Sequence, residues 1–291
     1  MPEVQPKIGL PKIGLPKIGL IAGGGAVPVE VARYLKESSR DYYVVRLEGM
    51  AEAELSDHPG RDISVGHFAE IFTALAQAQV RHICMVGYVK RPDFGTMPRD
   101  SGGVAHLPAI EQAGRGGDDG LLRQVARMFE AQGFVIEGAH EANPQLLLTE
   151  GLLAGPEPSQ AAREDLEEAF RIATAIGALD IGQAAVVAGK ITLAIEAQEG
   201  TDAMLRRIPA LPLPLIGNMH NRKGVLAKVC KPIQDRRLDM PTIGVATVEA
   251  ASEAGLCGIV GQAGSILVVD KARTFARAEE LGLFIYGHIA G

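Results

Sequence analysis

The feature that most constrains the fold is a short apolar segment that ends in three glycines and leads directly into a helical pattern. Residues 17–22 are rich in isoleucine and leucine, and residues 23–25 are all glycine. Pro28 then falls in the first turn of the expected helix, where a missing amide hydrogen leaves no hydrogen bond unmade. A strand, a glycine turn and a helix in this order predict the start of a parallel βαβ unit.

The alternation of strand and helix continues through the first half of the chain. Short runs of apolar and β-branched residues predict strands at 42–47, 82–89 and 134–136. Apolar residues within 68–75 and 121–131 recur at the spacing of an amphipathic helix. This order predicts an α/β domain with a largely parallel sheet.

A turn-rich stretch near the middle of the chain indicates a crossing between two domains. Residues 143–158 contain three prolines and two glycines. At about 100 to 200 residues per domain, a chain of 291 residues also favours two domains. We therefore expect one domain over 16–146 and a second over 147–291. Residues 1–15 are expected to be a dispensable extension, because PKIGL occurs three times in tandem and only the third copy runs into the first strand.

The second half of the chain follows a different pattern. Ser159 is expected to cap a long helix. Two apolar runs at 183–188 and 191–197 predict an antiparallel hairpin that turns at Gly189 and Lys190. Later apolar runs alternate with helical segments, so we expect a mixed α/β domain whose strand order the sequence leaves open.

Composition excludes several classes of protein. A net charge of −6, with lysines and arginines dispersed along the chain, argues against a broad nucleic-acid-binding surface. No run approaches the roughly 18 consecutive apolar residues of a membrane-spanning helix, and the first residues lack the apolar core of a signal peptide. Three well-separated cysteines do not form a disulfide framework, so the expected compartment is the reducing cytoplasm.

Two loops of the first half have the composition of an anion-binding site. Gly24 and Gly25 precede a helix whose N-terminal amides attract negative charge. Lys90, Arg91 and Asp93 follow a predicted strand, at the sheet edge where open α/β folds bind ligands. The alternatives are a purely structural glycine turn and a solvated loop, and the glycines lack the GxGxxG spacing of dinucleotide-binding folds.

The segment EAQEGTDAMLRR, residues 196–207, carries the densest group of polar residues. Glu196 and Glu199 leave a predicted strand, and Gly200 makes a turn. Thr201 is then expected to cap a helix that carries Asp202 in its first turn. Three carboxylates beside a helix N-terminus could hold Mg²⁺, or the hydroxyls of a sugar, next to a phosphate. Ordinary helix capping is the alternative.

A second polar cluster lies further along the chain, around an aspartate. Its members are Lys228, Lys231, Asp235, Arg236, Arg237 and Asp239. If the cations surround Asp239 and neutralise phosphate oxygens, Asp239 could orient or deprotonate a water molecule, or bind the metal that activates it. A surface cluster of salt bridges is the alternative. The histidines lack nucleophile or zinc-ligand spacing, so we assign them no catalytic role.

Several motifs, taken in order, resemble one known family. They are IGLIAGGGAVP, GYVKRPDF, LDIGQAAVV, EAQEGTDAMLRR, KPIQDRRLDMPTIGVAT and GIVGQAG. The family is that of the LpxI-type UDP-2,3-diacylglucosamine pyrophosphatases of Gram-negative lipid A synthesis. The resemblance implies a Rossmann-like amino-terminal domain and a mixed α/β carboxy-terminal catalytic domain. It also implies hydrolysis of UDP-2,3-diacylglucosamine to UMP and 2,3-diacylglucosamine 1-phosphate, with Mg²⁺ as the ion.

The resemblance assigns the catalytic role to Asp239. The family's essential aspartate lies in the segment that reads DMPTIG here, with Met240 where leucine is usual. The expected metal ligands are Asp239, Glu199 and Asp202. The expected substrate-binding residues are Gly24, Gly25, Lys90, Gln183, Gly200, Thr201, Asp202, Lys228 and Thr242. We expect the residues of the two domains to border one shared cleft.

The expected partner is a small lipid–nucleotide substrate and not a nucleic acid. Peripheral contact with the cytoplasmic face of the inner membrane and formation of a homodimer are both compatible with the sequence. Residues 208–216, an apolar run with three prolines, are predicted either to line a channel for the acyl chains or to tether the two domains. Two other functions stay open, a nicotinamide-dependent reductase and a non-catalytic binding protein for UDP-sugar lipids.

Overall fold

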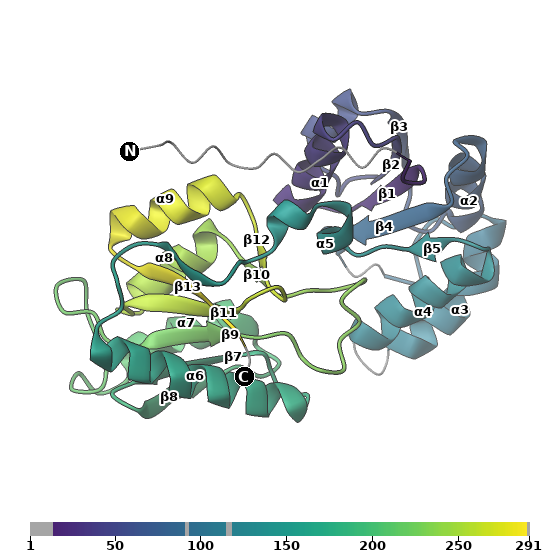
Figure 1. Cartoon of the computed structure of the whole chain (residues 1–291). Coiled ribbons are helices and arrows are strands. Elements are labelled where there is room, and N and C mark those ends of the chain that lie inside the picture. The colour runs from purple at the N-terminus through teal and green to yellow at the C-terminus, as the bar shows by residue number, and fades with distance from the viewer. Residues whose placement is uncertain (1–13, 91–92, 115–117, 290–291) are drawn as a thin grey trace, which may run out of the picture. The chain divides into compact units, whose positions relative to one another are not determined.

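The computed structural model describes residues 14–90, 93–114 and 118–289 of the chain. The chain forms two compact units that divide between Asn143 and Pro144 (Figure 1). Both units contain helices and strands, which confirms the predicted α/β fold class. Residues 1–13 of the predicted extension lie outside the described part of the chain.

The first unit is built on a parallel five-stranded sheet with the strand order β3-β2-β1-β4-β5. Its strands are β1 (Ile18–Ala22), β2 (Tyr42–Leu47), β3 (Gly60–Ile63), β4 (His82–Val86) and β5 (Val135–Ile136). Its helices are α1 (Ala26–Glu37), the 3₁₀ helix η1 (Ala53–Asp57), α2 (Phe68–Gln77), α3 (Ser101–Gly114), α4 (Asp118–Ala131) and α5 (Ala139–Ala142). The order reverses between β1 and β4, as in Rossmann-like folds, where ligands bind at that point of the sheet.

The first strand comes from the third copy of the PKIGL repeat. All five residues of β1 are buried, because the strand lies in the middle of the sheet between β2 and β4. Arg40 fixes the segment that leads into β1, because its Nε donates to the carbonyl oxygen of Pro16 at 3.1 Å.

Several elements of the first unit differ from the prediction, which also lacks the short helices η1 and α5. The strand expected at 82–89 is shorter and ends at Val86. Neither α3 nor β3 is predicted by the sequence pattern. In β3, an edge strand, two of the four residues are charged and exposed, so the segment lacks the apolar run that marks a buried strand.

The second unit contains a mixed six-stranded sheet with the order β6-β13-β11-β9-β7-β8 and a small parallel pair, β10-β12. The large sheet consists of β6 (Gly151–Ala154), β7 (Ala184–Ala188), β8 (Ile191–Ile195), β9 (Val225–Lys228), β11 (Gly258–Gln262) and β13 (Phe284–His288). The pair consists of β10 (Thr242–Ile243) and β12 (Leu267–Val268). The helices are η2 (Pro144–Leu146), α6 (Gln160–Ala178), α7 (Gly200–Arg207), η3 (Ile208–Ala210), α8 (Val245–Glu253) and α9 (Lys271–Leu281).

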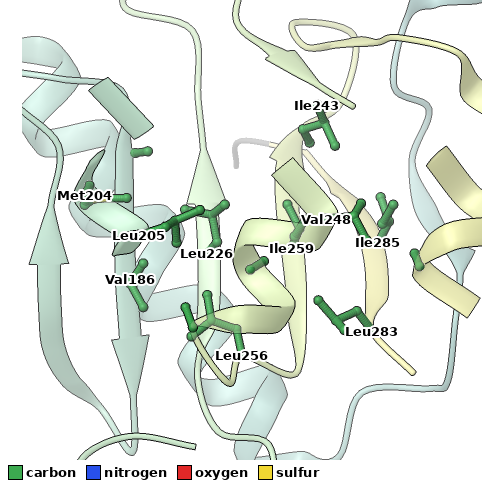
Figure 2. Close-up of a cluster of buried hydrophobic side chains, with 14 of the residues drawn as sticks. Val186, Met204, Leu205, Leu226, Ile243, Val248, Leu256, Ile259, Leu283 and Ile285 are labelled. Carbon is green, nitrogen blue, oxygen red and sulfur yellow. The ribbon is translucent and has the colours of Figure 1, made fainter. Parts of the chain in front are cut away.

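Side chains of the central strands alternate between two apolar cores. Val186 of β7 and Leu226 of β9 face a cluster formed with α7, α8 and α9, which Figure 2 shows in close-up. The neighbouring residues Val187 and Val225 project to the other face and pack against α6. The large sheet is therefore covered by helices on both faces.

Two of the predictions about turns and caps in this unit are confirmed, those for Ser159 and for the hairpin turn at Gly189 and Lys190. The Ser159 hydroxyl accepts a hydrogen bond from the amide of Ala162 at 3.2 Å, at the start of α6. Strands β7 and β8 pair in antiparallel fashion across Gly189 and Lys190, which have φ values of +57° and +64°. Two consecutive positive φ values are the geometry of the tight turn that joins such hairpins.

Residues 208–216 do not tether the two units, because they lie wholly within the second unit. Ile208 is fully buried, and Leu211 and Ile216 pack against the core shown in Figure 2. Leu213, by contrast, is 81% exposed. Among the described residues, no helix is both long and apolar enough to cross a membrane.

Candidate active site

The glycine loop after β1 lies where the strand order of the first unit reverses. Gly24 and Tyr88 exchange two backbone hydrogen bonds of 2.8 Å, which join this loop to the segment after β4. A Cβ atom on Gly23 would lie 2.5 Å from the carbonyl oxygen of Tyr88, and one on Gly24 would lie 2.9 Å from that of Met50. Close backbone packing therefore requires glycine at both positions.

Gly25 has a different environment, because its amide already binds a carboxylate. Its φ is +94°, and a Cβ atom there would meet nothing within 4 Å. At the N-terminus of α1, its N–H donates to Oε1 of Glu52 at 2.8 Å. A carboxylate thus stands where the sequence analysis places a phosphate, so a substrate phosphate at this amide would replace Glu52.

The loop after β4 contains one exposed cation and one carboxylate that stabilises a turn. Lys90 is exposed, at the carboxyl edge of the parallel sheet. Asp93 accepts a hydrogen bond from the amide of Gly95 at 2.9 Å, which is the behaviour of a turn residue. Arg91 lies outside the described residues.

In the second unit, a buried lysine lies at the end of a central strand. Lys228 is the last residue of β9 and only 6% exposed, and its Nζ donates to the carbonyl oxygen of Thr242 at 2.9 Å. Burial lowers the pKa of Lys228, and the charges of Glu196, Asp202 and Asp239 act in the opposite direction. Of these three carboxylates, Asp202 and Asp239 are exposed to solvent. The geometry therefore combines a buried cation with two carboxylates that a ligand can reach.

Glu196 organises the turn between β8 and α7. Its side chain is 5% exposed, and its Oε2 accepts from the amide of Gln183 at 3.0 Å. Its Oε1 accepts from the hydroxyl of Thr201, also at 3.0 Å. The prediction that Thr201 caps the helix is wrong, because α7 already begins at Gly200 and Thr201 donates to Glu196. Gly200 has a φ of +78°, which favours glycine in this turn.

Gln183 brings an unsatisfied acceptor to the same region. Its carbonyl oxygen accepts from the amide of Val229 at 2.9 Å, next to the end of β9. Its side-chain Oε1 is buried and has no hydrogen-bond partner within the described ranges. A buried acceptor without a donor is costly, and a hydroxyl or amide of a bound molecule would satisfy it.

Three of the four cations near Asp239 in the sequence have other partners in space, which corrects the prediction that all four surround it. Their partners are Asp180 for Lys231 and Asp235 for Arg237, both at 2.7 Å, and the carbonyl oxygen of Gly264 for Arg236. In the part of the chain that the structure describes, Asp239 accepts a hydrogen bond from Gln234 and forms no ion pair. The fourth predicted cation, Lys228, does interact with Asp239, whose charge opposes the lowering of the Lys228 pKa by burial.

The three predicted metal ligands are not assembled as a preformed site. Across residues 14–90, 93–114 and 118–289, no three His, Cys, Asp or Glu side chains form a group that could hold a metal ion. Glu199 pairs with Arg207 at 3.0 Å and accepts from the amide of Ala197 at 3.2 Å, so both of its oxygens are engaged. Mg²⁺ usually binds one or two carboxylates together with substrate phosphates. Asp202 and Asp239, which are both exposed, could supply these one or two carboxylates.

Two family models match the chain, one on each side of the turn-rich stretch. The LpxI N-terminal domain matches residues 17–146, and the LpxI C-terminal domain matches residues 149–286. The chain belongs to the LpxI family. The UDP-2,3-diacylglucosamine pyrophosphatase LpxI of Caulobacter vibrioides is 49% identical to it over 268 residues, which cover 92% of this chain and 96% of the relative. These matches confirm the resemblance that the motifs indicate.

The second LpxI domain brings several of the predicted site residues together. Lys228 bonds to Thr242 and interacts electrostatically with Asp202 and Asp239. The residues Gly24, Gly25 and Lys90 belong to the first unit, and their joint use with this group stays a prediction. In the sequence analysis, Glu196 counts among three carboxylates that could hold Mg²⁺ but not among the expected ligands. Glu196 follows the buried Ala194 by two positions and so continues the buried face of β8.

Proposed function

We propose that this protein hydrolyses the pyrophosphate bond of UDP-2,3-diacylglucosamine to UMP and 2,3-diacylglucosamine 1-phosphate, a step of lipid A biosynthesis. The observation that carries the proposal is the buried ammonium of Lys228 beside the exposed carboxylates of Asp202 and Asp239. A pyrophosphate supplies negative charge to such a cation, while the carboxylates supply groups that activate water or bind a metal. The 49% sequence identity to the UDP-2,3-diacylglucosamine pyrophosphatase of Caulobacter vibrioides supports this substrate.

Asp239 is the proposed catalytic residue. Hydrolysis requires a water molecule to add to one phosphorus atom while the bridging oxygen leaves with the other phosphate. The Asp239 carboxylate either accepts the proton of that water or binds the ion that activates it. Lys228 offsets the negative charge of the phosphates, and electrostatic stabilisation of this kind is often the largest single contribution to catalysis.

Mg²⁺, where it is bound, would neutralise phosphate oxygens and make the phosphorus more electrophilic. Asp202 and Asp239 are the residues that would hold it, because Glu199 is engaged by Arg207. The other proposed substrate contacts are Gly24, Gly25, Lys90, Gln183, Gly200, Thr201 and Thr242. Of these, Gln183 accounts best for a specific contact, since its buried Oε1 needs a donor.

The proposed location is the cytoplasm, with peripheral contact to the inner membrane surface where a diacylated substrate resides. Sedimentation with vesicles of anionic and of neutral phospholipid tests this contact. Sedimentation velocity of the purified protein tests whether it forms a homodimer.

The experiment that tests the function is incubation of the purified protein with UDP-2,3-diacylglucosamine and Mg²⁺, followed by identification of the products. Release of UMP and of 2,3-diacylglucosamine 1-phosphate is expected, and chelation of the metal is expected to abolish it. Substrate binding without UMP release would indicate a non-catalytic binding protein. Saturable binding of NADH or NADPH without hydrolysis would favour a reductase.

A further inference from the structure

Two charged side chains, Glu196 and Lys228, lie in one row across the sheet of the second unit. Ala184 of β7 pairs with Lys228 of β9, and the carbonyl oxygen of Ala184 accepts from the amide of Glu196 at 2.9 Å. Directly opposed residues on neighbouring strands project to the same face of a sheet. Glu196 and Lys228 therefore share a face, and Ala184 lies between them in the row.

This face of the sheet is otherwise apolar. Val186 and Leu226, two positions away along β7 and β9, belong to the buried cluster under α7 and α8 (Figure 2). Unpaired charges are costly in such surroundings. Glu196 is 5% exposed and Lys228 is 6% exposed, and among the charges that raise the pKa of Lys228 the largest contribution comes from Glu196. Each side chain thus offsets the charge of the other.

The carboxylate of Glu196 also connects two predicted substrate contacts. It accepts from Gln183, which carries the unsatisfied Oε1, and from Thr201, which precedes Asp202 in the first turn of α7. Both carboxylate oxygens are occupied by these donors, and the side chain is buried. Burial thus keeps a substrate away from Glu196, whose oxygens each hold a residue of the turn, so Glu196 acts through its neighbours.

We infer that Glu196 is a positioning residue of the active site, which fixes the turn that presents Thr201 and Asp202 and balances the ammonium of Lys228. The inference rests on the proposed pyrophosphatase function. Glu196 is distinct from Glu199, the acid that the sequence favours, because Glu199 is exposed and pairs with Arg207.

The second unit supplies a matched control in Asp165. This aspartate is also 5% exposed, and its two oxygens accept from the amides of Gly189 and Lys190 at 2.9 and 2.7 Å. Asp165 and Glu196 are thus buried carboxylates with two donors each. Asp165 holds only the turn between β7 and β8, so its replacement disturbs stability without touching the proposed site.

The test compares Glu196→Gln with Asp165→Asn in the full-length protein, using release of UMP from UDP-2,3-diacylglucosamine. Glutamine keeps the size of Glu196 and can still accept from the Gln183 amide, so it removes the charge and reverses only the hydrogen bond with the Thr201 hydroxyl, which must then accept. We expect Glu196→Gln to lower kcat about tenfold or more, with KM changed less than about threefold. Asp165→Asn is expected to leave both constants unchanged. Rates are divided by the number of substrate-binding sites found by titration, so a variant that folds only in part still gives a valid constant.

A double-mutant cycle with Lys228→Met separates positioning from a general structural effect. If Glu196 acts through Lys228, Glu196→Gln costs much less in the Lys228→Met background than in the wild type. An equal loss in both backgrounds overturns the inference, as does a normal kcat for Glu196→Gln. A wild-type protein that releases no UMP refutes the proposed function itself, and the inference with it.

Discussion

Each unit contains a cluster of charges around a buried cation, and the two clusters differ in how completely that cation is paired. In the first unit, Arg40 is 6% exposed and donates to both carboxylate oxygens of Glu137 at 2.8 Å. His82 contacts the same carboxylate at 2.6 Å. In the second unit, within the residues that the structure describes, Lys228 donates to a backbone carbonyl and has no direct ion pair with the carboxylates around it.

The comparison separates a charge that holds a fold from a charge that is available to a ligand. The two parallel hydrogen bonds between Arg40 and Glu137 satisfy both partners. Removal of one partner of such a pair strongly destabilises the folded protein. Lys228 keeps hydrogen-bond donors for a further acceptor, next to two exposed carboxylates. We therefore expect changes in the first cluster to affect stability and changes in the second to affect catalysis.

The largest expected effect belongs to Asp239, on the catalytic side of the comparison. Asp239→Ala is expected to lower kcat by about 10² to 10⁴ while substrate binding is largely retained, because the group acts mainly in the transition state. Asp239→Asn should be equally inactive, since it keeps the shape but not the charge. UMP release and substrate co-purification measure the two quantities. Near-normal turnover would remove Asp239 from the mechanism, and lost binding would make it a positioning residue.

On the structural side, Arg40→Met is expected to destabilise the protein by about 3 kcal/mol, because Glu137, whose side chain is only 17% exposed, loses its cation and keeps only His82. The kcat of the folded variant should be unchanged. Urea unfolding measures the effect, and Arg171→Met, which breaks an exposed pair with Glu168, should change stability by less than about 1 kcal/mol. An equally small loss for Arg40→Met would show that the buried pair does not hold the fold.

The pair of Arg40 and Glu137 also makes the difference in stability between wild type and Arg40→Met depend on pH. Burial by itself would raise the pKa of Glu137, but the hydrogen bonds and charge of Arg40, together with His82, lower it below its usual value. The pair therefore stabilises the protein fully above the pKa of an unfolded glutamate, about 4.3, and is lost as the pH falls through the lower folded value. Unfolding of wild type and Arg40→Met, measured from pH 7 to pH 3, should converge at the acidic end.

Lys228→Met tests the cluster of the second unit in the same way as Arg40→Met tests that of the first. Removal of this cation is expected to lower kcat by about 10² to 10³, in the range of other electrostatic groups. The loss of stability should be smaller than for Arg40→Met, because the Glu196 carboxylate left behind keeps both of its hydrogen-bond donors. Parallel urea titrations of the two variants decide this point, and a larger loss for Lys228→Met would contradict the distinction between the clusters.

The smallest expected effect is that of the amino-terminal repeat. Deletion of residues 2–15 keeps β1 and also Pro16, whose carbonyl oxygen binds Arg40. Melting temperature and kcat should therefore stay close to those of the full chain. A large drop in melting temperature would show that the earlier PKIGL copies contribute to the fold.

The sequence alone determined the elements whose signals are local. The glycine turn after β1, the cap at Ser159 and the hairpin turn at Gly189 are set by residues only a few positions apart. The motif around Asp239 likewise identified the family, because a family resemblance depends only on the order of residues along the chain.

Tertiary structure decided which distant residues meet. Lys231, Arg236 and Arg237 are near Asp239 in the sequence, yet each finds another partner in space. The buried acid of the site is Glu196 and not Glu199, because pairing of β8 with β7 and of β7 with β9 places Glu196 in the row of Lys228. Strand order and register bring such residues together, and the energy of a charge depends on its distance to other charges and to water, which the linear sequence does not contain.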